Sequence, residues 1–297
     1  MVVFNKKIRS ILQALRPIQW IKNLSLFAAV ILNGQLFNFP IFTKSLLGFL
    51  VFCFLSSSSY LINDLVDVEK DRLHPVKKFR PIARGDLSES NAIFIAFILL
   101  FLGLFVSIFI SFGFFWISLF FILLQYAYSF FLKKKAVIDI IGIAFFFIIR
   151  AYAGELATGY HLPVWIMLAV IFLSLFLASG KRRSEIVGSG TLTRSSLNDY
   201  SSNLLDFYTN MFAVCTLIAY AMFTFFEEPI TFNGLIHNYL LENFPKALGR
   251  KWYMVTLLPV IFGIMRYGQV IYEMQEGERP EKVIATDIPL ILAIFSW

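Results

Sequence analysis

The chain has 297 residues, of which 58% are hydrophobic and only 15% are charged. Because a soluble domain is about one-quarter charged, this composition excludes a soluble, secreted or disordered protein. It also excludes a nucleic-acid binder, despite the formal charge of +7. Cys53 and Cys215 lie in separate apolar stretches without CxxC spacing, which disfavours a disulfide or a metal–thiolate site. We therefore predict an all-α polytopic membrane protein in contact with membrane lipids.

The N-terminal segment, 1–23, is basic and contains apolar residues at intervals. It lacks a compact apolar core that ends in a small-residue cleavage site, as a signal peptide would have. A basic amphipathic helix is typical of segments that lie in the membrane interface. We predict an interfacial basic helix over 1–23.

The apolar runs that follow predict a bundle of eight to nine transmembrane helices. A bilayer core of about 30 Å requires about 20 helical residues for one crossing. A ninth run is short, so it is either a half-span or an incomplete one. The predicted spans are 24–39, 44–62, 91–111, 113–132, 138–154, 163–180, 204–226, 251–272 and the short 287–297.

The 26 Lys and Arg residues are distributed unevenly between the connecting segments. If the N-terminus is cytoplasmic, most of them lie on the cytoplasmic side, as the positive-inside rule requires for a plasma-membrane (inner-membrane) protein. Two cytoplasmic connections, 63–90 and 181–203, are longer than neighbouring helices need, and we predict that both are active-site loops. With no internal repeat and no soluble segment, 1–297 is predicted to be one transmembrane domain.

Four oxygen-bearing side chains fall on one face where the second span ends. If the helix continues through NDLVDVEKD at 63–71, Asn63, Asp64, Asp67 and Asp71 lie within an arc of about 100°. Glu69 points away from this face.

Carboxylates that face one another repel unless a cation lies among them. Hard oxygen ligands suit Mg²⁺, which commonly bridges to substrate phosphates, so we predict that these four residues form a magnesium site. The alternative is a solvated acidic helix end that Lys70 and Arg72 neutralise.

A basic stretch follows, which contains Lys77, Lys78, Arg80 and Arg84. Cations beside a magnesium site favour a phosphate-binding clamp, and we predict Lys77, Arg80 and Arg84 as substrate-binding residues. Lys77 and Lys78 have an alternative explanation, which is contact with anionic lipid.

The acidic segment resembles the NDxxDxxxD motif of the UbiA superfamily of intramembrane prenyltransferases, whose Asp-rich helix ends bind Mg²⁺-diphosphate. Other segments are similar to the decaprenyl-phosphate phosphoribosyltransferases of this superfamily, and the resemblance extends over nearly the whole chain. They are RPIQWIKN at 16–23, DRLHPVKKFRPIARGDLS at 71–88, IRAYAG at 149–154 and SGKRRSEI at 179–186.

The resemblance implies a UbiA-like bundle with its active site at the cytoplasmic face. It also implies transfer of 5-phosphoribose from phosphoribosyl diphosphate (PRPP) to a polyprenyl (decaprenyl) phosphate, with release of diphosphate, for cell-envelope polysaccharide synthesis. Asp67, Asp71 and Lys22 are then expected to be catalytic, and Lys22 and Asn23 to face the substrate cavity.

The sequence departs from the aromatic prenyltransferases of the superfamily, which carry a second Asp-rich motif after the sixth span. Here that position holds GKRRSE at 180–185. We predict that Lys181 and Arg182 bind substrate phosphates and that Tyr200 donates a hydrogen bond to substrate, although an interfacial Tyr is also a common membrane-belt residue.

Arg150 lies within a predicted span, where a charge is costly unless it faces a partner or a cavity. An ion pair with Glu155 and a ligand-binding role are both open. Two other functions also remain as alternatives: a UbiA-type enzyme that transfers a prenyl group from a prenyl diphosphate to an aromatic acceptor, and a lipid transporter. The absent second Asp-rich motif disfavours the first, and the absence of charged midplane clusters and inverted repeats disfavours the second. The sequence leaves a homo-oligomer open.

Overall fold

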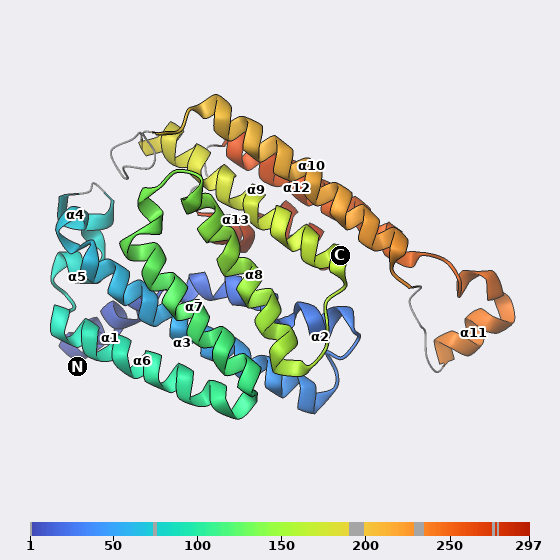
Figure 1. The fold of residues 1–297 in the computed structure, drawn as a ribbon, viewed down its shortest axis with the longest axis horizontal. Helices are drawn as coiled ribbons and strands as arrows, with labels where there is room; N and C mark the ends of the chain where they lie inside the picture. The colour runs from blue at the N-terminus through green and yellow to red at the C-terminus, as the bar shows by residue number, and fades with distance from the viewer. Residues whose placement is uncertain (1, 74–75, 190–198, 229–234, 275–276, 278) are drawn as a thin grey trace. The chain divides into compact units, whose positions relative to one another are not determined.

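The computed structural model describes residues 2–73, 76–189, 199–228, 235–274, 277 and 279–297, and every regular element in them is helical (Figure 1). The all-α prediction is confirmed. In chain order the elements are α1 (Val2–Leu15), η1 (Pro17–Phe27), α2 (Ala28–Leu32), α3 (Phe39–Val66), α4 (Val68–Leu73), η2 (Lys77–Phe79), α5 (Pro81–Arg84), α6 (Glu89–Ile110), α7 (Phe112–Phe130), η3 (Leu132–Lys134), α8 (Ile138–Thr158), α9 (Val164–Ser189), α10 (Ser202–Phe226), α11 (Leu235–Asn243), η6 (Pro245–Ala247), η7 (Trp252–Thr256), α12 (Leu257–Tyr272), α13 (Pro280–Thr286) and α14 (Ile288–Ser296).

Seven helical segments among the described residues are long and apolar enough to cross a membrane. They match seven of the predicted runs to within a few residues. These segments are Phe39–Val66, Glu89–Ile110, Phe112–Lys134, Ile138–Thr158, Val164–Val187, Ser202–Phe226 and Trp252–Tyr272.

The first predicted span, 24–39, has the wrong bounds, because its helical segment is Pro17–Leu32. Eleven of these residues form the 3₁₀ helix η1, and five form α2. A 3₁₀ helix rises about 2.0 Å per residue, so η1 and α2 together extend about 30 Å, close to the thickness of a bilayer core. The chain then turns at Gly34, which adopts the left-handed conformation with φ 65°.

The short run at 287–297 contains α14, a nine-residue helix. At 1.5 Å per residue such a helix extends only about 14 Å, less than half of a bilayer core. Two predicted runs, the first and the ninth, therefore hold shorter apolar helices, Pro17–Leu32 and α14. The predicted eight to nine transmembrane helices compare with seven candidate spans among the described residues.

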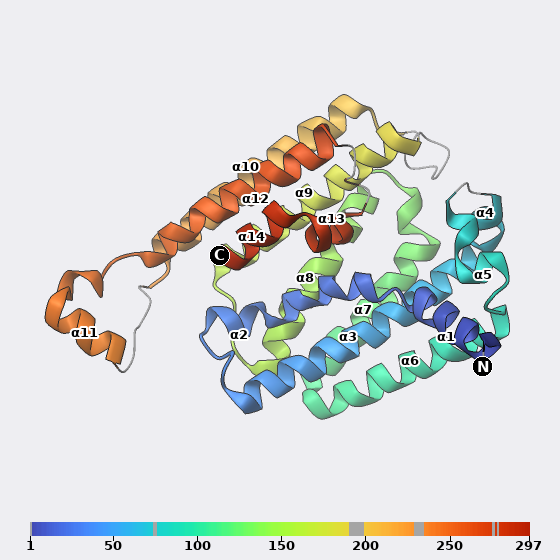
Figure 2. The ribbon, with the colours of Figure 1, turned by 180° about the vertical axis from the view of Figure 1, so that it is seen from behind.

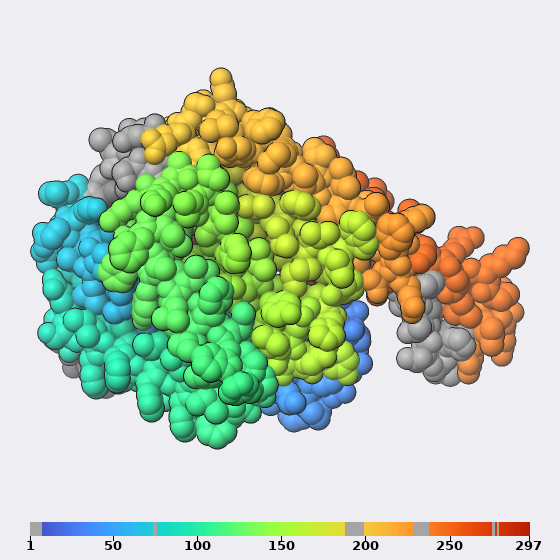
Figure 3. All heavy atoms as spheres, in the orientation of Figure 1, coloured from blue at the N-terminus to red at the C-terminus, as the bar shows by residue number. Residues whose placement is uncertain are grey.

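Contacts within the chain group the residues into two compact units, 1–142 with 146–162, and 143–145 with 163–297. The first unit is built on α3, which packs against α6, α7 and η1 (Figure 2). Its core contains Leu26, Phe52, Leu55, Phe121 and Phe146, and the rings of Phe52 and Phe121 lie 4.8 Å apart. The apolar outer face of α6 is exposed on the surface of this unit (Figure 3).

The second unit pairs α9 with α10 and places α12 against both of them and against α14. Phe176, Tyr267, Ile271 and Leu290 are buried in its core. The prediction of one domain over 1–297 stays a prediction.

Both predicted active-site loops are partly helical. In 63–90, α3 continues to Val66, and α4, η2 and α5 follow. In 181–203, α9 continues to Ser189, because this stretch has no Pro to end the helix. The start of the second predicted loop was therefore wrong, and its residues 190–198 lie outside the described part of the chain.

Candidate active site

The acidic motif lies where α3 ends and α4 begins. Asp67 terminates α3 with φ −95° and ψ 6°, but its N–H still bonds to the carbonyl of Asn63, and the N–H of Asp71 bonds to the carbonyl of Asp67. The predicted continuous helix over 63–71 is therefore correct except for one residue at its centre. Glu69, which was predicted to point away, is exposed and pairs with Arg72.

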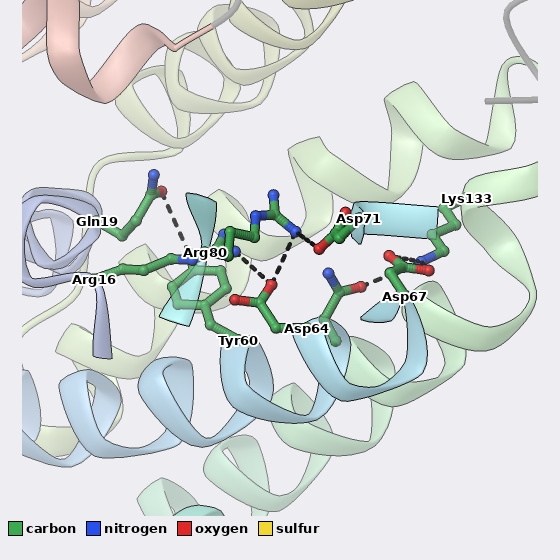
Figure 4. A network of polar contacts seen from close by, with 9 residues as sticks. Arg16, Gln19, Tyr60, Asp64, Asp67, Asp71, Arg80 and Lys133 are labelled. Carbon is green, nitrogen blue, oxygen red and sulfur yellow. Dashed lines mark hydrogen bonds and ion pairs between the residues drawn. The ribbon is translucent and has the colours of Figure 1, made fainter. Parts of the chain in front are cut away.

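Arg80 joins two carboxylates of the motif (Figure 4). Its Nη1 atom lies 3.0 Å from Oδ1 of Asp64 and 2.5 Å from Oδ2 of Asp71. Both carboxylates are buried. Burial raises the pKa of the Asp71 carboxyl above its usual range, and the ion pair with Arg80 opposes this shift.

Arg16 supplies a second cation to Asp64, with Nη2 2.5 Å from Oδ1. Its guanidinium lies over the ring of Tyr60, 5.2 Å from the centroid. Arg16 adopts a left-handed backbone, with φ 53° and ψ 61°, between α1 and Pro17. A non-glycine residue with positive φ is strained, and such strain concentrates at functional sites.

Lys133 binds the other half of the motif. Its Nζ atom lies 2.8 Å from Oδ2 and 3.1 Å from Oδ1 of Asp67, and 3.2 Å from Oδ1 of Asn63 (Figure 4). The motif is thus divided between two groups of cations, with Asp64 and Asp71 on one side and Asn63 and Asp67 on the other.

An apolar cluster supports this site from within the first unit. Ala14, Leu61, Ile82 and Leu87 pack together and come from α1, α3, α5 and the segment before α6. The cluster fixes the elements from which Arg16, Asp64 and Arg80 extend. Of the other predicted basic residues of 63–90, Arg84 pairs with Asp86, and Lys77 lies in η2.

Lys22 and Asn23 lie in η1, but they occupy different surroundings. The Lys22 Nζ atom is 2.6 Å from Oε1 of Gln19, whose Oε1 is also 3.5 Å from the Tyr60 hydroxyl. Asn23 is fully buried, and its Oδ1 accepts a hydrogen bond from Arg150 Nε at 2.7 Å. The prediction that Lys22 and Asn23 face the substrate cavity stays a prediction.

Glu155 is not the partner of Arg150. It accepts a hydrogen bond from the backbone N–H of Leu162 at 2.6 Å and lies 3.5 Å from the His161 ring. The ion pair considered from the sequence is therefore wrong, because a spacing of five residues turns the two side chains to different faces of α8.

The predicted phosphate-binding residues after the sixth run belong to the second unit. Lys181 is half-buried on α9, whereas Arg182 is fully buried and pairs with Glu185 one turn later. Arg183 pairs with Asp206 at 2.6 Å and lies over the ring of Tyr272. Tyr200 is buried.

The donor set of the acidic motif fits a magnesium ion in its chemistry, because carboxylate and amide oxygens are the ligands that Mg²⁺ takes. Within the described ranges, no three His, Cys, Asp or Glu side chains are grouped closely enough to hold a metal ion. Arg80 instead pairs with Asp64 and Asp71, and Lys133 pairs with Asp67. The oxygen ligands of the motif are of the kind that Mg²⁺ binds. In this structure the positive charges of Arg80 and Lys133 neutralise the carboxylates.

Arg16 and Lys133 were not predicted as site residues from the sequence. A local pattern marked both positions: Arg16 is the first residue of the segment RPIQWIKN, and Lys133 is the first of three consecutive lysines. Their contacts with Asp64 and Asp67 span 48 and 66 residues, and such long-range contacts have no local pattern.

Comparison with known proteins identifies relatives over the whole chain. The profile of the UbiA prenyltransferase family matches residues 24–181. The chain is 35% identical to the decaprenyl-phosphate phosphoribosyltransferase of Mycolicibacterium smegmatis, with 98% of this chain and 90% of that protein covered. It is 31% identical to the protein of the same name from Mycobacterium tuberculosis, with 98% and 92% covered.

Solved structures support the fold. A UbiA homologue from Archaeoglobus fulgidus bound to GPP and Mg²⁺ has a TM-score of 0.70 at 22% identity, with 96% of this chain and 98% of that chain covered. A structure of digeranylgeranylglyceryl phosphate synthase has a TM-score of 0.65 at 20% identity, with 98% of each chain covered.

Proposed function

This chain belongs to the UbiA prenyltransferase family, and on that premise we propose that it transfers 5-phosphoribose from PRPP to decaprenyl phosphate or a similar polyprenyl phosphate. The observation that carries the proposal is its identity of 31–35% to decaprenyl-phosphate phosphoribosyltransferases over nearly the full length. The carboxylate and guanidinium groups at the end of α3 support it, because both substrates are anionic.

The reaction is a substitution at the anomeric carbon of PRPP. An oxygen of the lipid phosphate forms a bond to this carbon while the bond to the diphosphate oxygen breaks, and diphosphate leaves with the electron pair. The lipid phosphate is already ionised near neutral pH and needs no general base. The protein therefore contributes mainly by positioning the two anions and by stabilising the charge of the leaving group.

Asn63, Asp64, Asp67 and Asp71 are the residues that would hold Mg²⁺, which when bound would neutralise charge on the departing diphosphate. Asp67 and Asp71 are catalytic residues in this proposal, together with Lys22. Arg80, Arg16 and Lys133 contact these carboxylates. They therefore lie close enough to bind a diphosphate or phosphate group held at the same site. Arg80 and Arg16 offer planar guanidinium groups, which bind phosphates through paired hydrogen bonds.

The remaining predicted residues are assigned to phosphate binding. We propose that Lys77 and Arg84 of the first unit, and Lys181, Arg182 and Tyr200 of the second, contact phosphate groups of PRPP or of the lipid. We also propose that the protein lies in the plasma membrane with these residues on the cytoplasmic side, where PRPP is made.

Transfer of radiolabel from ribose-labelled PRPP to extractable lipid tests the function. Purified protein, decaprenyl phosphate and Mg²⁺ are incubated with the donor, alongside Asp67→Ala and Lys181→Ala. Labelled lipid from the unmodified protein, and none from either variant, is the expected result. Turnover of a prenyl diphosphate with no labelled lipid would refute the proposal in favour of an aromatic-acceptor prenyltransferase.

A further inference from the structure

Arg150 is a buried cation in the middle of α8. Its guanidinium donates to Oδ1 of Asn23 at 2.7 Å, to the carbonyl of Phe146 at 2.7 Å and to Oγ of Ser56 at 3.4 Å, and it lies 4.8 Å from the centroid of the Phe121 ring. All of these acceptors are neutral. A charge at this depth is costly, and these contacts offset part of that cost.

The guanidinium connects three elements of the first unit: α8 itself, α3 through Ser56, and η1 through Asn23. The Asn23 amide is fixed in turn, because its Nδ2 donates to the Cys53 sulfur on α3 at 3.3 Å. Arg150 therefore orients Asn23 and holds η1 against two membrane helices.

A second contact joins the same two elements one turn further along α8. A Cβ atom at Gly154 would lie 2.2 Å from the carbonyl oxygen of Leu26 in η1. Residues 150 and 154 share a face of α8, as do the η1 residues three apart that they contact. Only glycine allows the η1 backbone to approach so closely.

The conformation of η1 makes such anchoring necessary. It is a 3₁₀ helix of 11 residues, whereas runs longer than about 3–4 residues are uncommon because their hydrogen-bond geometry is poor. The same segment carries Lys22 and Gln19, and it begins directly after Arg16, which binds Asp64. Displacement of η1 would move Arg16 away from Asp64.

We propose that Arg150 is a positioning residue, which docks η1 on α8 through Asn23 and so holds Arg16 at the carboxylate site. The catalytic part of this inference rests on the proposed function, but the docking does not. Removal of Arg150 alone leaves Oδ1 of Asn23 without its donor, and an unpaired buried acceptor destabilises the fold. Gly154→Ala, which keeps Arg150, and a measurement of Tm in detergent for each variant therefore separate loss of docking from loss of fold.

Cys53 provides a built-in probe, because its thiol is buried and contacts Asn23 of η1. In a Cys215→Ser background, the rate at which N-ethylmaleimide alkylates Cys53 in detergent-solubilised protein reports local opening of η1. Arg150→Met is expected to raise this rate about tenfold, since reactivity of a buried group follows local opening. Gly154→Ala, which displaces η1 without changing Arg150, is expected to do the same.

Arg150→Lys keeps the charge but lacks the fork that reaches Asn23 and Ser56 together, and an intermediate rate is expected. Matched controls come from the second unit. Arg266→Met removes a guanidinium that contacts Asp287 and Gln269, and Gly263→Ala adds a Cβ with only an ordinary contact at 3.8 Å. Both controls should leave the alkylation rate of Cys53 unchanged. Equal rates in Arg150→Met and the unmodified protein, or similar increases in the controls, would overturn the proposal.

A kinetic double-mutant cycle tests the link to the site. Arg150→Met and Arg16→Gln should each raise KM for PRPP, and the double variant should show little further increase, because Arg150 acts by holding Arg16 at Asp64. Fully additive effects on KM would contradict positioning. If the unmodified protein transfers no phosphoribose, the proposed function fails, while the alkylation experiment still decides whether Arg150 docks η1.

Discussion

Lys133 contacts both carboxylate oxygens of Asp67 and the amide oxygen of Asn63, so one ammonium group is the partner of half of the acidic motif. Arg80 is the partner of the other half. Each carboxylate of the motif is thus balanced by a cation, and Arg16 and Lys133 come from distant parts of the chain. The side chains that are expected to bind metal are thus already paired with cations, and one of these cations, Arg80, is itself expected to bind phosphate.

Lys133→Gln is expected to lower kcat/KM for PRPP by about 100-fold, because it removes a fixed positive charge next to Asp67. Steady-state phosphoribosyl transfer measures this effect. Lys134→Gln is the matched control: its side chain is exposed, and it should retain kcat/KM within about twofold, as surface charges contribute little. Equal losses in the two variants would indicate a general effect of loop charge.

Val137 stores backbone strain close to Lys133. With φ 66° and ψ −47°, and with a hydrogen bond from Ile138 N to the Ala136 carbonyl at 2.8 Å, it forms a γ-turn of the rare type. A β-branched residue rarely adopts positive φ. The turn sets the entry of the chain into α8.

Val137→Gly is expected to stabilise the fold by about 1 kcal/mol. The substitution relieves strain of about 1–3 kcal/mol, which exceeds the added entropy of glycine in the unfolded chain, about 0.5–1 kcal/mol. Thermal unfolding in detergent measures the change. Ile138→Gly, at the first residue of α8, should instead destabilise; a lower Tm for Val137→Gly would show that the turn is not strained.

Among the elements, α12 and α14 are joined by Arg266 and Asp287. The guanidinium contacts both carboxylate oxygens, with Nη2 2.8 Å from Oδ2, and Oδ1 of Asp287 also caps α14 by accepting from Leu290 N at 3.0 Å. The hydrogen bonds from Arg266 hold the pKa of the Asp287 carboxyl below its usual range, against the opposing effect of burial. One side chain therefore both starts a helix and joins it to its neighbour.

Asp287→Asn is expected to lower Tm at neutral pH, because Asn keeps the cap but loses the charge. A depressed folded pKa gives stability that is present above the unfolded value of about 3.9 and is lost as pH falls through the folded pKa. The difference in Tm should therefore shrink below about pH 4. Asp287→Ala, which also loses the cap, should be less stable than Asp287→Asn at every pH.

For the whole molecule, the uneven distribution of the basic residues determines the predicted orientation. Lys133–Lys135 and the basic part of 63–90 contact or surround the acidic motif in the first unit. The basic residues on which the predicted orientation depends therefore include Arg80 and Lys133, which contact the acidic motif. By contrast, Arg250 lies in the segment between α11 and α12, which the orientation places on the opposite side.

Cysteine labelling in intact cells tests this orientation. In a background with Cys53→Ser and Cys215→Ser, a membrane-impermeant maleimide should label Arg250→Cys and should label Lys134→Cys only after the cells are opened. Both positions are exposed, so access and not burial decides the result. Labelling of Lys134→Cys in intact cells would contradict the proposed orientation and indicate the opposite one.

The sequence by itself determined the helical membrane class, seven of the spans and the acidic motif, because apolar run length and helical periodicity are local properties of the chain. It also placed Glu69 outside the site correctly. The resemblance of the sequence to the UbiA superfamily predicted the fold and the proposed reaction. These conclusions need no knowledge of contacts between distant residues.

Only the tertiary structure decided which cation meets which carboxylate. Arg80 bridges Asp64 and Asp71, Lys133 binds Asp67, and Arg150 turns to Asn23 instead of Glu155. The tertiary structure also fixed the first apolar segment at Pro17–Leu32, because tertiary contacts support a 3₁₀ helix that local propensity would not favour. The pairings of Lys133 and Arg150 join side chains 66 and 127 residues apart, and helix packing and the cost of leaving a buried charge without a partner determine them.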